Sequence, residues 1–575
     1  MNEPPALPAS AAERSLRRAE WQPVVFAERL RRVELARLRP SDLEASGPLE
    51  ALSIKVFRNH AFEYVASALG PFLAFAGFSP TVTLSDYDDA LSDVTVGARV
   101  ALVWLDFSRY AGRFERPEAL AAWLASRVTA MRQGFDGPVL VADHAPLGGD
   151  GDAGLAGLNA ALETALAGLA GVHLLPVSAL AEALGPGAAD PRSKALGSRW
   201  SDRLNLESAR HLGLRWLPAS VAPRLKALAL DLDHTLYAGV LGEDGVQGVA
   251  LTEGHRRLQE TLVALRARGL FLAVVSRNER ADVDALFAAR DDFALKAEHI
   301  SAWGVSWGAK SEAIAAIAAQ LRIGVDAVLF VDDNPGELAA VSAALPTVKT
   351  LHAAPEGALT ARALGLAPGL FAWRVSREDQ LRAADLAASE ARRALETPEL
   401  DREAYLASLG VKLTFAVPQG EALARVHELS NKTNQFNLGM ARLSAAEVSH
   451  RAGSAEAGFV TVSLEDRLSD SGVIAVVGAR REGETLVVDE VCISCRAMGR
   501  DLEDLIVGES VAHLATRLGA AGVRYRWRRG PRNGPALHWL ARYEAVEALD
   551  GDDGGEVPST PRRPRPMPVE IIWSM

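Results

Sequence analysis

Short apolar runs alternate with amphipathic segments along much of the chain. Between about residues 50 and 220 the apolar runs include ARVALVWLDF and GPVLVAD, and EALAAWLASRV between them has helical spacing. Apolar strands that alternate with amphipathic helices predict a parallel sheet covered by helices. The same alternation restarts near residue 224 with LKALALDLD, LFLAVVS and DAVLFVDD, and it ends near residue 368, where GLAPGLF interrupts it.

The C-terminal third has a different pattern. A charged helical segment covers about 376–408, and the strands VKLTFAV, FVTVSLED, GVIAVVGAR and TLVVDEVCIS and a helix near 501–518 follow it. The proline-rich, charged tail is typical of disorder. We therefore predict a multidomain α/β protein with five parts: a helical segment 1–49, α/β domains 50–220 and 224–368, a helical linker with an α+β domain 376–550, and a disordered tail 551–575.

Composition narrows the classes of function. The formal net charge of −11 argues against a general nucleic-acid binder. The chain has no run of about 18 apolar residues and no signal-peptide pattern at its start, so we expect a cytoplasmic protein without a membrane span. The two cysteines, Cys492 and Cys495, lie in an apolar run without a second ligand pair. Buried strand thiols are therefore favoured over a zinc site.

Two carboxylates end the first strand of the second α/β domain. Asp231 and Asp233 alternate with Leu232, so both acids point to one face while the leucine enters the core. They lie at the carboxyl end of a buried strand, where α/β sheets bind ligands. Because like charges repel, a hard divalent cation with oxygen ligands such as Mg²⁺ suits this pair.

Three further groups follow along this domain. Ser276 ends a strand and is followed by Arg277 and Asn278, and a hydroxyl with adjacent amides suits a phosphate oxygen. Lys310 precedes a helix and can neutralise a phosphoryl group. Two more acids, Asp332 and Asp333, end the strand DAVLFVDD, so loops at one edge of a doubly wound sheet would bring all these groups together.

The order D-x-D-x-T, Ser, Lys and D-D resembles the haloacid dehalogenase superfamily. The resemblance implies that Asp231 is the nucleophile and Asp233 the general acid and base. It implies that Thr235, Ser276, Arg277, Asn278 and Lys310 contact the substrate, with Ser276 and Lys310 on the phosphoryl oxygens. It also implies that Asp332 pairs with Lys310, and that Asp231, the Asp233 carbonyl and Asp333 bind Mg²⁺.

Longer motifs give a closer resemblance. DLDHTLYAGVLGEDGVQGVAL, WGAKSE, VDDNP, NKTNQFNL and SCRAMGRDLE resemble the FkbH-like proteins of this superfamily, often with SGNH-like N-terminal and GNAT-like C-terminal domains. The resemblance implies transfer of a glyceryl group from 1,3-bisphosphoglycerate to the phosphopantetheine thiol of an acyl carrier protein in polyketide biosynthesis. His234, Tyr237 and Arg277 replace commoner residues of the family, and Val275 stands where many relatives have cysteine. We therefore expect transfer without a cysteine relay in this domain, or a different acyl group.

The segments between the motifs leave room for a flap but for no cap domain. An uncapped site excludes water poorly, which suits a bulky partner such as a carrier protein, whereas closure of the flap over a small metabolite is the alternative.

The outer domains give weaker signals. Arg496 to Asp501 resembles a GNAT pyrophosphate loop in which Gly499 fits, but Asp501 adds a negative charge that weakens acetyl coenzyme A binding. The amides of NKTNQFN could bind a ligand or cap a helix, and the arginines around Trp527 could be solvated or could dock an acidic carrier. The first α/β domain has adjacent Asp143 and His144 and no G-D-S nucleophile, so we interpret it as a scaffold or docking domain.

Three functions remain at this stage. They are a glyceryl-type transferase and phosphatase, a plain phosphatase for a small metabolite or phosphoprotein, and a non-catalytic scaffold. The complete set of acids, serine and lysine favours an enzyme over the scaffold.

Overall fold

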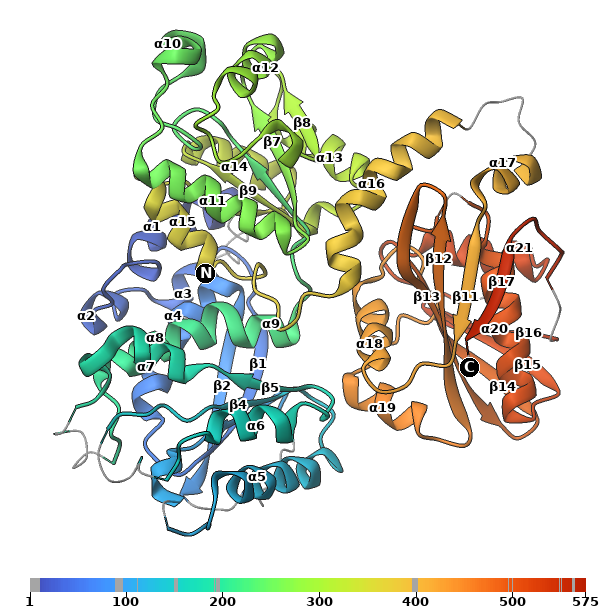
Figure 1. Ribbon diagram of the computed structural model, residues 1–575, viewed down its shortest axis with the longest axis horizontal. Helices are drawn as coiled ribbons and strands as arrows, with labels where there is room; N and C mark the ends of the chain where they lie inside the picture. Colours follow the sequence, from blue (N-terminus) through green and yellow to red (C-terminus); the bar gives the residue numbers. More distant parts are fainter. Residues whose placement is uncertain are drawn as a thin grey trace, which may run out of the picture. The chain divides into compact units, whose positions relative to one another are not determined.

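The computed structural model forms two compact units, Met1–Val375 and Ser376–Met575. Figure 1 colours the first from blue to yellow and the second from orange to red. The first unit contains two five-stranded sheets and the second a seven-stranded sheet. The predicted fold class, a multidomain α/β protein, is therefore confirmed. The structure describes residues 11–87, 91, 97–110, 112–148, 152, 154–190, 192, 197–395, 402–494, 496–498, 500–547, 549, 551–560 and 564–574.

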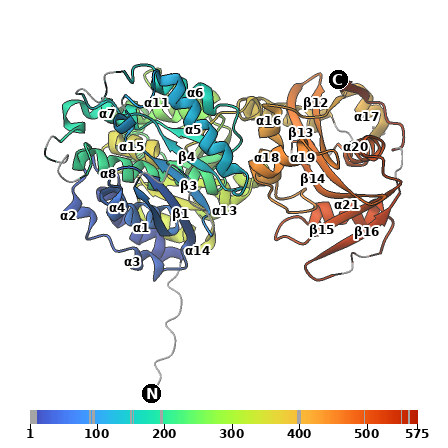
Figure 2. The ribbon, with the colours of Figure 1, turned by 90° about the horizontal axis from the view of Figure 1, so that it is seen from below.

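The first sheet is parallel and has the order β2-β1-β3-β4-β5. Alternate residues of its central strand enter two separate cores: Leu102 faces one with α4 and α8, whereas Val103 faces the other with α5 and α6. Figure 2 shows α5 and α6 together beside the sheet. Its strands and principal helices are β1 (Glu50–Arg58), α4 (Glu63–Ala76), β2 (Phe78–Tyr87), β3 (Val100–Trp104), α5 (Pro117–Arg132), β4 (Val139–Ala142), α6 (Leu158–Leu166), β5 (Val172–Leu175), α7 (Val177–Leu184), α8 (Asp202–His211) and α9 (Leu217–Val221).

From residue 11 onward the N-terminal segment is helical, as its spacing predicts, and it contacts the second sheet. Ser15 Oγ lies 2.8 Å from Thr350 Oγ1, and Arg362 donates from Nε to the Phe26 carbonyl at 2.9 Å. Its helices are α1 (Ala11–Val25), α2 (Arg32–Leu35) and α3 (Pro40–Glu44).

The second sheet is also parallel, with the order β10-β9-β6-β7-β8. After β6 the chain adds β7 and β8 on one side, and it then adds β9 and β10 on the other side of β6. The strand order therefore reverses at β6. Loops that leave neighbouring strands in opposite directions open a crevice there, at the carboxyl edge. The elements are β6 (Ala227–Leu230), α10 (Leu241–Gly248), α11 (Glu253–Ala267), β7 (Phe271–Ser276), α12 (Arg280–Ala289), β8 (Ala302–Val305), α13 (Lys310–Gln320), β9 (Val328–Asp332), α14 (Pro335–Ala344), β10 (Lys349–His352) and α15 (Gly357–Leu366).

The second unit has the sheet order β16-β15-β14-β13-β12-β11-β17. Strands β11 to β14 are antiparallel, and β15 runs parallel to β14. The four predicted strands form β11 to β14, and the predicted helix near 501–518 forms α20. The elements are α16 (Arg377–Leu395), α17 (Arg402–Leu409), β11 (Lys412–Ala416), α18 (Ala422–Lys432), α19 (Ala445–Ala452), β12 (Ala457–Asp466), β13 (Ser469–Glu482), β14 (Thr485–Ile493), α20 (Glu503–Leu518), β15 (Gly522–Arg528) and α21 (Gly534–Tyr543).

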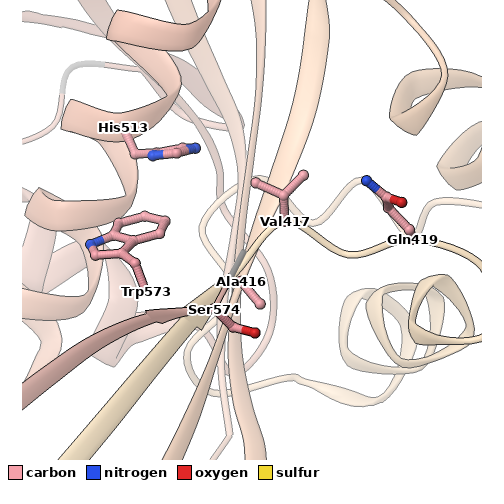
Figure 3. Close-up of a pocket in the computed structure, with 6 residues that line it drawn as sticks. All are labelled: Ala416, Val417, Gln419, His513, Trp573 and Ser574. Carbon is pink, nitrogen blue, oxygen red and sulfur yellow. The ribbon is translucent and has the colours of Figure 1, made fainter.

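The tail 551–575 was predicted to be disordered, and this is wrong for two segments. Strand β16 (Gly554–Ser559) pairs antiparallel with β15, and β17 (Glu570–Ser574) pairs parallel with β11. Trp573 of β17 stacks on His513 of α20 with ring centroids 4.3 Å apart, and Figure 3 shows both rings lining a surface pocket. The prolines and charges hide these strands in the sequence, because their stability comes from pairing with strands that are distant along the chain.

No helix among the described residues is both long and apolar enough to cross a membrane.

Candidate functional site

The predicted site residues meet at the carboxyl edge of the second sheet, where the strand order reverses. Asp231 follows β6, Ser276 ends β7 and Asp332 ends β9. β6 lies between β7 and β9, so these three positions are on adjacent strands. Each strand is an apolar run buried on both faces, and the first polar residue at its end is held where the loops begin.

A buried lysine lies between two carboxylates. Lys310, the first residue of α13, places Nζ 2.6 Å from Asp332 Oδ2 and 3.1 Å from Asp231 Oδ1. All three side chains are buried. Burial alone would lower the pKa of Lys310, but Asp231 and Asp332 outweigh it and raise that pKa. The lysine is therefore a fixed positive charge, and its pairing with Asp332 is the one that the resemblance implies.

A third carboxylate completes the cluster. One oxygen each of Asp231, Asp332 and Asp333 lies within 4.8 Å of the others. Burial raises the pKa of Asp231 to about 7, with Lys310 opposing and Asp332 adding to the effect, and burial and Asp332 also raise the pKa of Asp333. One ammonium thus faces three carboxylates in a poorly solvated place.

This donor set fits a hard divalent cation. Oxygen ligands at this separation suit Mg²⁺, and its charge would offset the excess negative charge. The cluster includes Asp332 in addition to the expected Asp231 and Asp333. The backbone carbonyl of Asp233 stays a predicted ligand, because its carboxylate is engaged elsewhere.

Asp233 is held by three hydrogen bonds. Its Oδ1 accepts from the Tyr237 hydroxyl at 2.8 Å and from the Leu241 amide at 2.9 Å, and its Oδ2 accepts from Asn278 Nδ2 at 2.9 Å. Burial, followed by Asp233, raises the pKa of Tyr237, so the phenol stays protonated and remains a donor. Both carboxylate oxygens of Asp233 therefore have fixed partners. Two of these partners, Tyr237 and Leu241, belong to the flap segment that ends in α10.

The residues after β7 divide into two groups. Asn278 Nδ2 also donates to Ser276 Oγ at 3.1 Å, and Ser276 acts to lower the pKa of Asp231. Asn278 therefore links the serine to the second acid. The Arg277 guanidinium pairs with Glu337 at 3.0 Å, and its side chain is 47% exposed.

Thr235 is buried in the turn after β6, and its Oγ1 has no hydrogen-bond partner among the described residues. Its amide donates to the Leu232 carbonyl at 3.1 Å, which closes the turn. An unsatisfied buried hydroxyl at this place is available to a ligand.

The sequence did not identify Tyr237 as a partner of Asp233. Its only signal was a departure from the usual family residue, whereas its position four residues after Asp233 in a turn is what brings the hydroxyl back to the carboxylate. The Asn334 amide, which donates to Asp332 Oδ1 at 2.8 Å, was also missed.

The acid and histidine of the first α/β domain have separate partners. Asp143 accepts hydrogen bonds from the amide and hydroxyl of Ser178, and burial raises its pKa to about 6. His144 Nε2 lies 3.4 Å from Asp152 Oδ1. Asp143 and His144 therefore each interact with a different residue.

Acidic residues lie at the start of α20. Asp501 precedes the helix, and Glu503 and Asp504 lie in its first turn. Arg500 is buried and places NH2 3.3 Å from Asp466 Oδ2, in the interior of the unit. Gly499 and Cys495 lie outside the described residues.

The NKTNQFN segment begins in the last turn of α18 and ends beside β14, where Asn437 forms an isolated bridge with Cys492. Leu438 donates from its amide to the Val491 carbonyl of β14 at 3.0 Å, and it accepts at its carbonyl from the Arg528 amide of β15 at 3.0 Å. Leu438 therefore bridges β14 and β15 where the two strands no longer pair with each other. The Asn437 side chain donates to the Ser430 and Thr433 carbonyls at the end of α18. Of the two open interpretations, the structure supports helix capping for Asn437.

Cys492 and Trp527 both belong to strands of the second unit. Cys492 is buried, its Sγ donates to Glu490 Oε1 at 3.1 Å, and burial raises the pKa of its thiol. The strand-thiol interpretation is therefore confirmed for Cys492. Trp527 is buried, and the neighbouring Arg524 and Arg526 pair with Glu556 of β16 at 2.8 and 2.7 Å.

Comparisons with known proteins give distant similarities. Neither a family model nor a curated protein matches the chain. A crystal structure of the N-terminal part of the protein BF1531 from Bacteroides fragilis, described as containing a phosphatase domain complexed with Mg, has 18% identity and a TM-score of 0.46 over 63% of this chain and 99% of its own. The spermidine N-acetyltransferase SpeG from Vibrio cholerae, in a mutant form, has 13% identity and a TM-score of 0.20 over 26% of this chain and 94% of its own. An acetyltransferase of the GNAT family from Streptococcus pneumoniae has 12% identity and a TM-score of 0.19 over 26% and 99%. These similarities are too distant to assign an activity to this chain.

Proposed function

We propose that this chain is a magnesium-dependent enzyme that removes phosphoryl groups through Asp231. The observation that carries the proposal is the buried Lys310 ammonium, 3.1 Å from Asp231 Oδ1, beside three carboxylates whose oxygens lie within 4.8 Å of one another. Such a site stabilises negative charge at one end and binds a cation at the other. A purely structural salt bridge would not need the additional acids.

The residues have distinct roles in this proposal. Asp231 attacks the phosphorus atom, the bond to the leaving oxygen breaks, and Asp233 gives that oxygen a proton. Water then attacks the aspartyl phosphate while Asp233 takes its proton, so phosphate leaves and Asp231 is restored. Bound Mg²⁺ supplies the positive charge that lets an anionic carboxylate approach an anionic phosphoryl group. Ser276 and Lys310 contact the phosphoryl oxygens.

The finer proposal follows the resemblance to FkbH-like proteins. The carrier thiolate attacks the acyl carbon of 1,3-bisphosphoglycerate, the bond from that carbon to the phosphate oxygen breaks, and a phosphate ion leaves. A glyceryl group carries no phosphate, so the remaining phosphate ester must also be hydrolysed, and this is the step that Asp231 performs. Val275 at the end of β7 supports direct attack by the carrier thiol, because it offers no thiol for a relay.

The test separates the two reactions. Phosphate release from 3-phosphoglycerate measures the ester step, and intact mass of a holo-carrier protein incubated with 1,3-bisphosphoglycerate and Mg²⁺ measures loading. We expect Asp231→Asn to lower ester hydrolysis by at least about 10³-fold, because the nucleophile is gone. Near-normal hydrolysis by this variant, or full activity with excess chelator, rejects the site. Normal hydrolysis by the wild type without loading of any carrier leaves the plain phosphatase as the function.

A further inference from the structure

An exposed tryptophan stands beside the phosphoryl site. Trp307 is 67% exposed and lies in the loop between β8 and α13, whose residues 306–309 are all exposed. The residue before it, Ser306, donates its amide to the Ser276 carbonyl at 3.1 Å, and Lys310 follows three residues later. Trp307 thus lies in the loop that connects Ser306, which is hydrogen-bonded to Ser276, with Lys310.

The ring is held in a fixed orientation although it faces solvent. Its Nε1 donates to Glu279 Oε1 at 2.7 Å, and Glu279 belongs to the loop that follows Ser276. Leaving a large aromatic surface in water is unfavourable, and fixing it adds an entropic cost. A preorganised exposed aromatic is typical of a residue that is covered by a ligand.

The loop after β7 and the start of α12 each hold an arginine that is paired with an acid. Arg277 pairs with Glu337 at 3.0 Å, and Arg280 pairs with Asp284 at 2.8 Å. The indole presents a large apolar face, and a chain of methyl and amide groups packs well on such a face. No cap domain separates it from solvent, because only the short helix α10 and α11 lie between β6 and β7.

We infer that Trp307 contacts the flexible arm of the thiol acceptor and guides its thiol to the acyl group. This inference rests on the proposed function. The arm that fits is an uncharged chain of amide and methyl groups that ends in a thiol, as in pantetheine. Trp307 is then a specificity-determining residue for the acceptor, and it takes no part in phosphate ester hydrolysis.

The test compares two thiols that differ only in the arm. Pantetheine has the chain and cysteamine lacks it, and thioester formation from 1,3-bisphosphoglycerate is followed by mass for each. Trp307→Ala should lower kcat/KM for pantetheine about tenfold, the order expected for one aromatic contact, and leave cysteamine unchanged. Trp307→Phe should retain most of the activity, because it keeps an aromatic face. Glu279→Ala should give an intermediate loss, because it removes only the hydrogen bond that fixes the ring.

Controls separate failure of this inference from failure of the proposed function. Tyr87→Ala removes another aromatic ring, 50% exposed in β2 of the first sheet, and should change neither thiol. Phosphate release from 3-phosphoglycerate should be unchanged in Trp307→Ala. Equal losses with both thiols, or no loss with either, overturn the inference alone. A wild-type enzyme that hydrolyses 3-phosphoglycerate but acylates neither thiol overturns the proposed transfer and this inference with it.

Discussion

Replacing Tyr237 by phenylalanine tests whether the flap positions the second acid. The change removes a single hydroxyl, which donates to Asp233 Oδ1 at 2.8 Å. The Leu241 amide still binds the same oxygen and Asn278 the other, so the carboxylate should remain near its place. A hydrogen bond to a charged acceptor contributes about 1.5–3 kcal/mol. With the other two bonds intact we expect the lower part of that range, which corresponds to a fall of about 10- to 30-fold in kcat.

The assay is steady-state phosphate release from 3-phosphoglycerate with saturating Mg²⁺. Because Tyr237 contacts Asp233 and not the phosphoryl pocket, kcat should fall while KM stays within about twofold. Asn278→Leu removes the bond to the other oxygen and also the bond to Ser276, so its loss should be larger. Tyr87→Phe removes a phenol hydroxyl from the first sheet and serves as the matched control. An unchanged kcat in Tyr237→Phe, or a loss seen only in KM, would refute the positioning role.

Three other predictions concern separate parts of the chain. Burial lowers the pKa of His60 to about 4, whereas a histidine in the unfolded chain has a pKa near 6.5. The free energy of unfolding should therefore fall as the pH drops from about 6.5 to 4, by about 2 kcal/mol at pH 5. His60→Gln should reduce the fall in apparent Tm between pH 7.5 and 5, and an identical fall in the variant contradicts this. Asp501, with Glu503 and Asp504 in the first turn of α20, should prevent tight binding of acetyl coenzyme A; a micromolar Kd by calorimetry on the full chain would overturn it. The double variant Cys492→Ser, Cys495→Ala should still load the carrier, as measured by mass, because the buried Cys492 thiol has a raised pKa and is a poor nucleophile. Loss of loading in a folded variant, with an acyl group trapped on the wild-type C-terminal domain, would show a cysteine relay.

The site was predictable to the extent that each group ends a strongly apolar strand. The runs before Asp231, Ser276 and Asp332 form β6, β7 and β9 because hydrophobic side chains on both faces allow only a buried strand. The sequence then places their ends at one edge, since parallel strands share a direction. It could not show that the Asp233 carboxylate turns toward Tyr237, because that depends on the path of a short turn.

The missed elements share a physical cause. Strand β8 is short and reads AWGV, with a glycine that weakens the strand pattern, and β10 reads KTLH with three polar residues. In the tail, the β16 residue Val557 is buried and Glu556 pairs with two arginines of β15, so distant partners stabilise a segment whose own composition suggests disorder. Local pattern cannot report pairing of this kind.

The central claim is that Asp231 takes the phosphoryl group, and the most direct measurement is the mass of the peptide that contains it. Asp233→Asn lacks the base for the water step, whereas acetyl phosphate has a leaving group that needs no proton. This variant should therefore accumulate a phosphoryl adduct on the Asp231 peptide after acid quench in the presence of Mg²⁺. The adduct should be absent from Asp231→Asn and from samples with chelator. Acetyl phosphate turnover by the wild type with no adduct on this peptide in either enzyme, or an adduct on a different residue, would contradict the account.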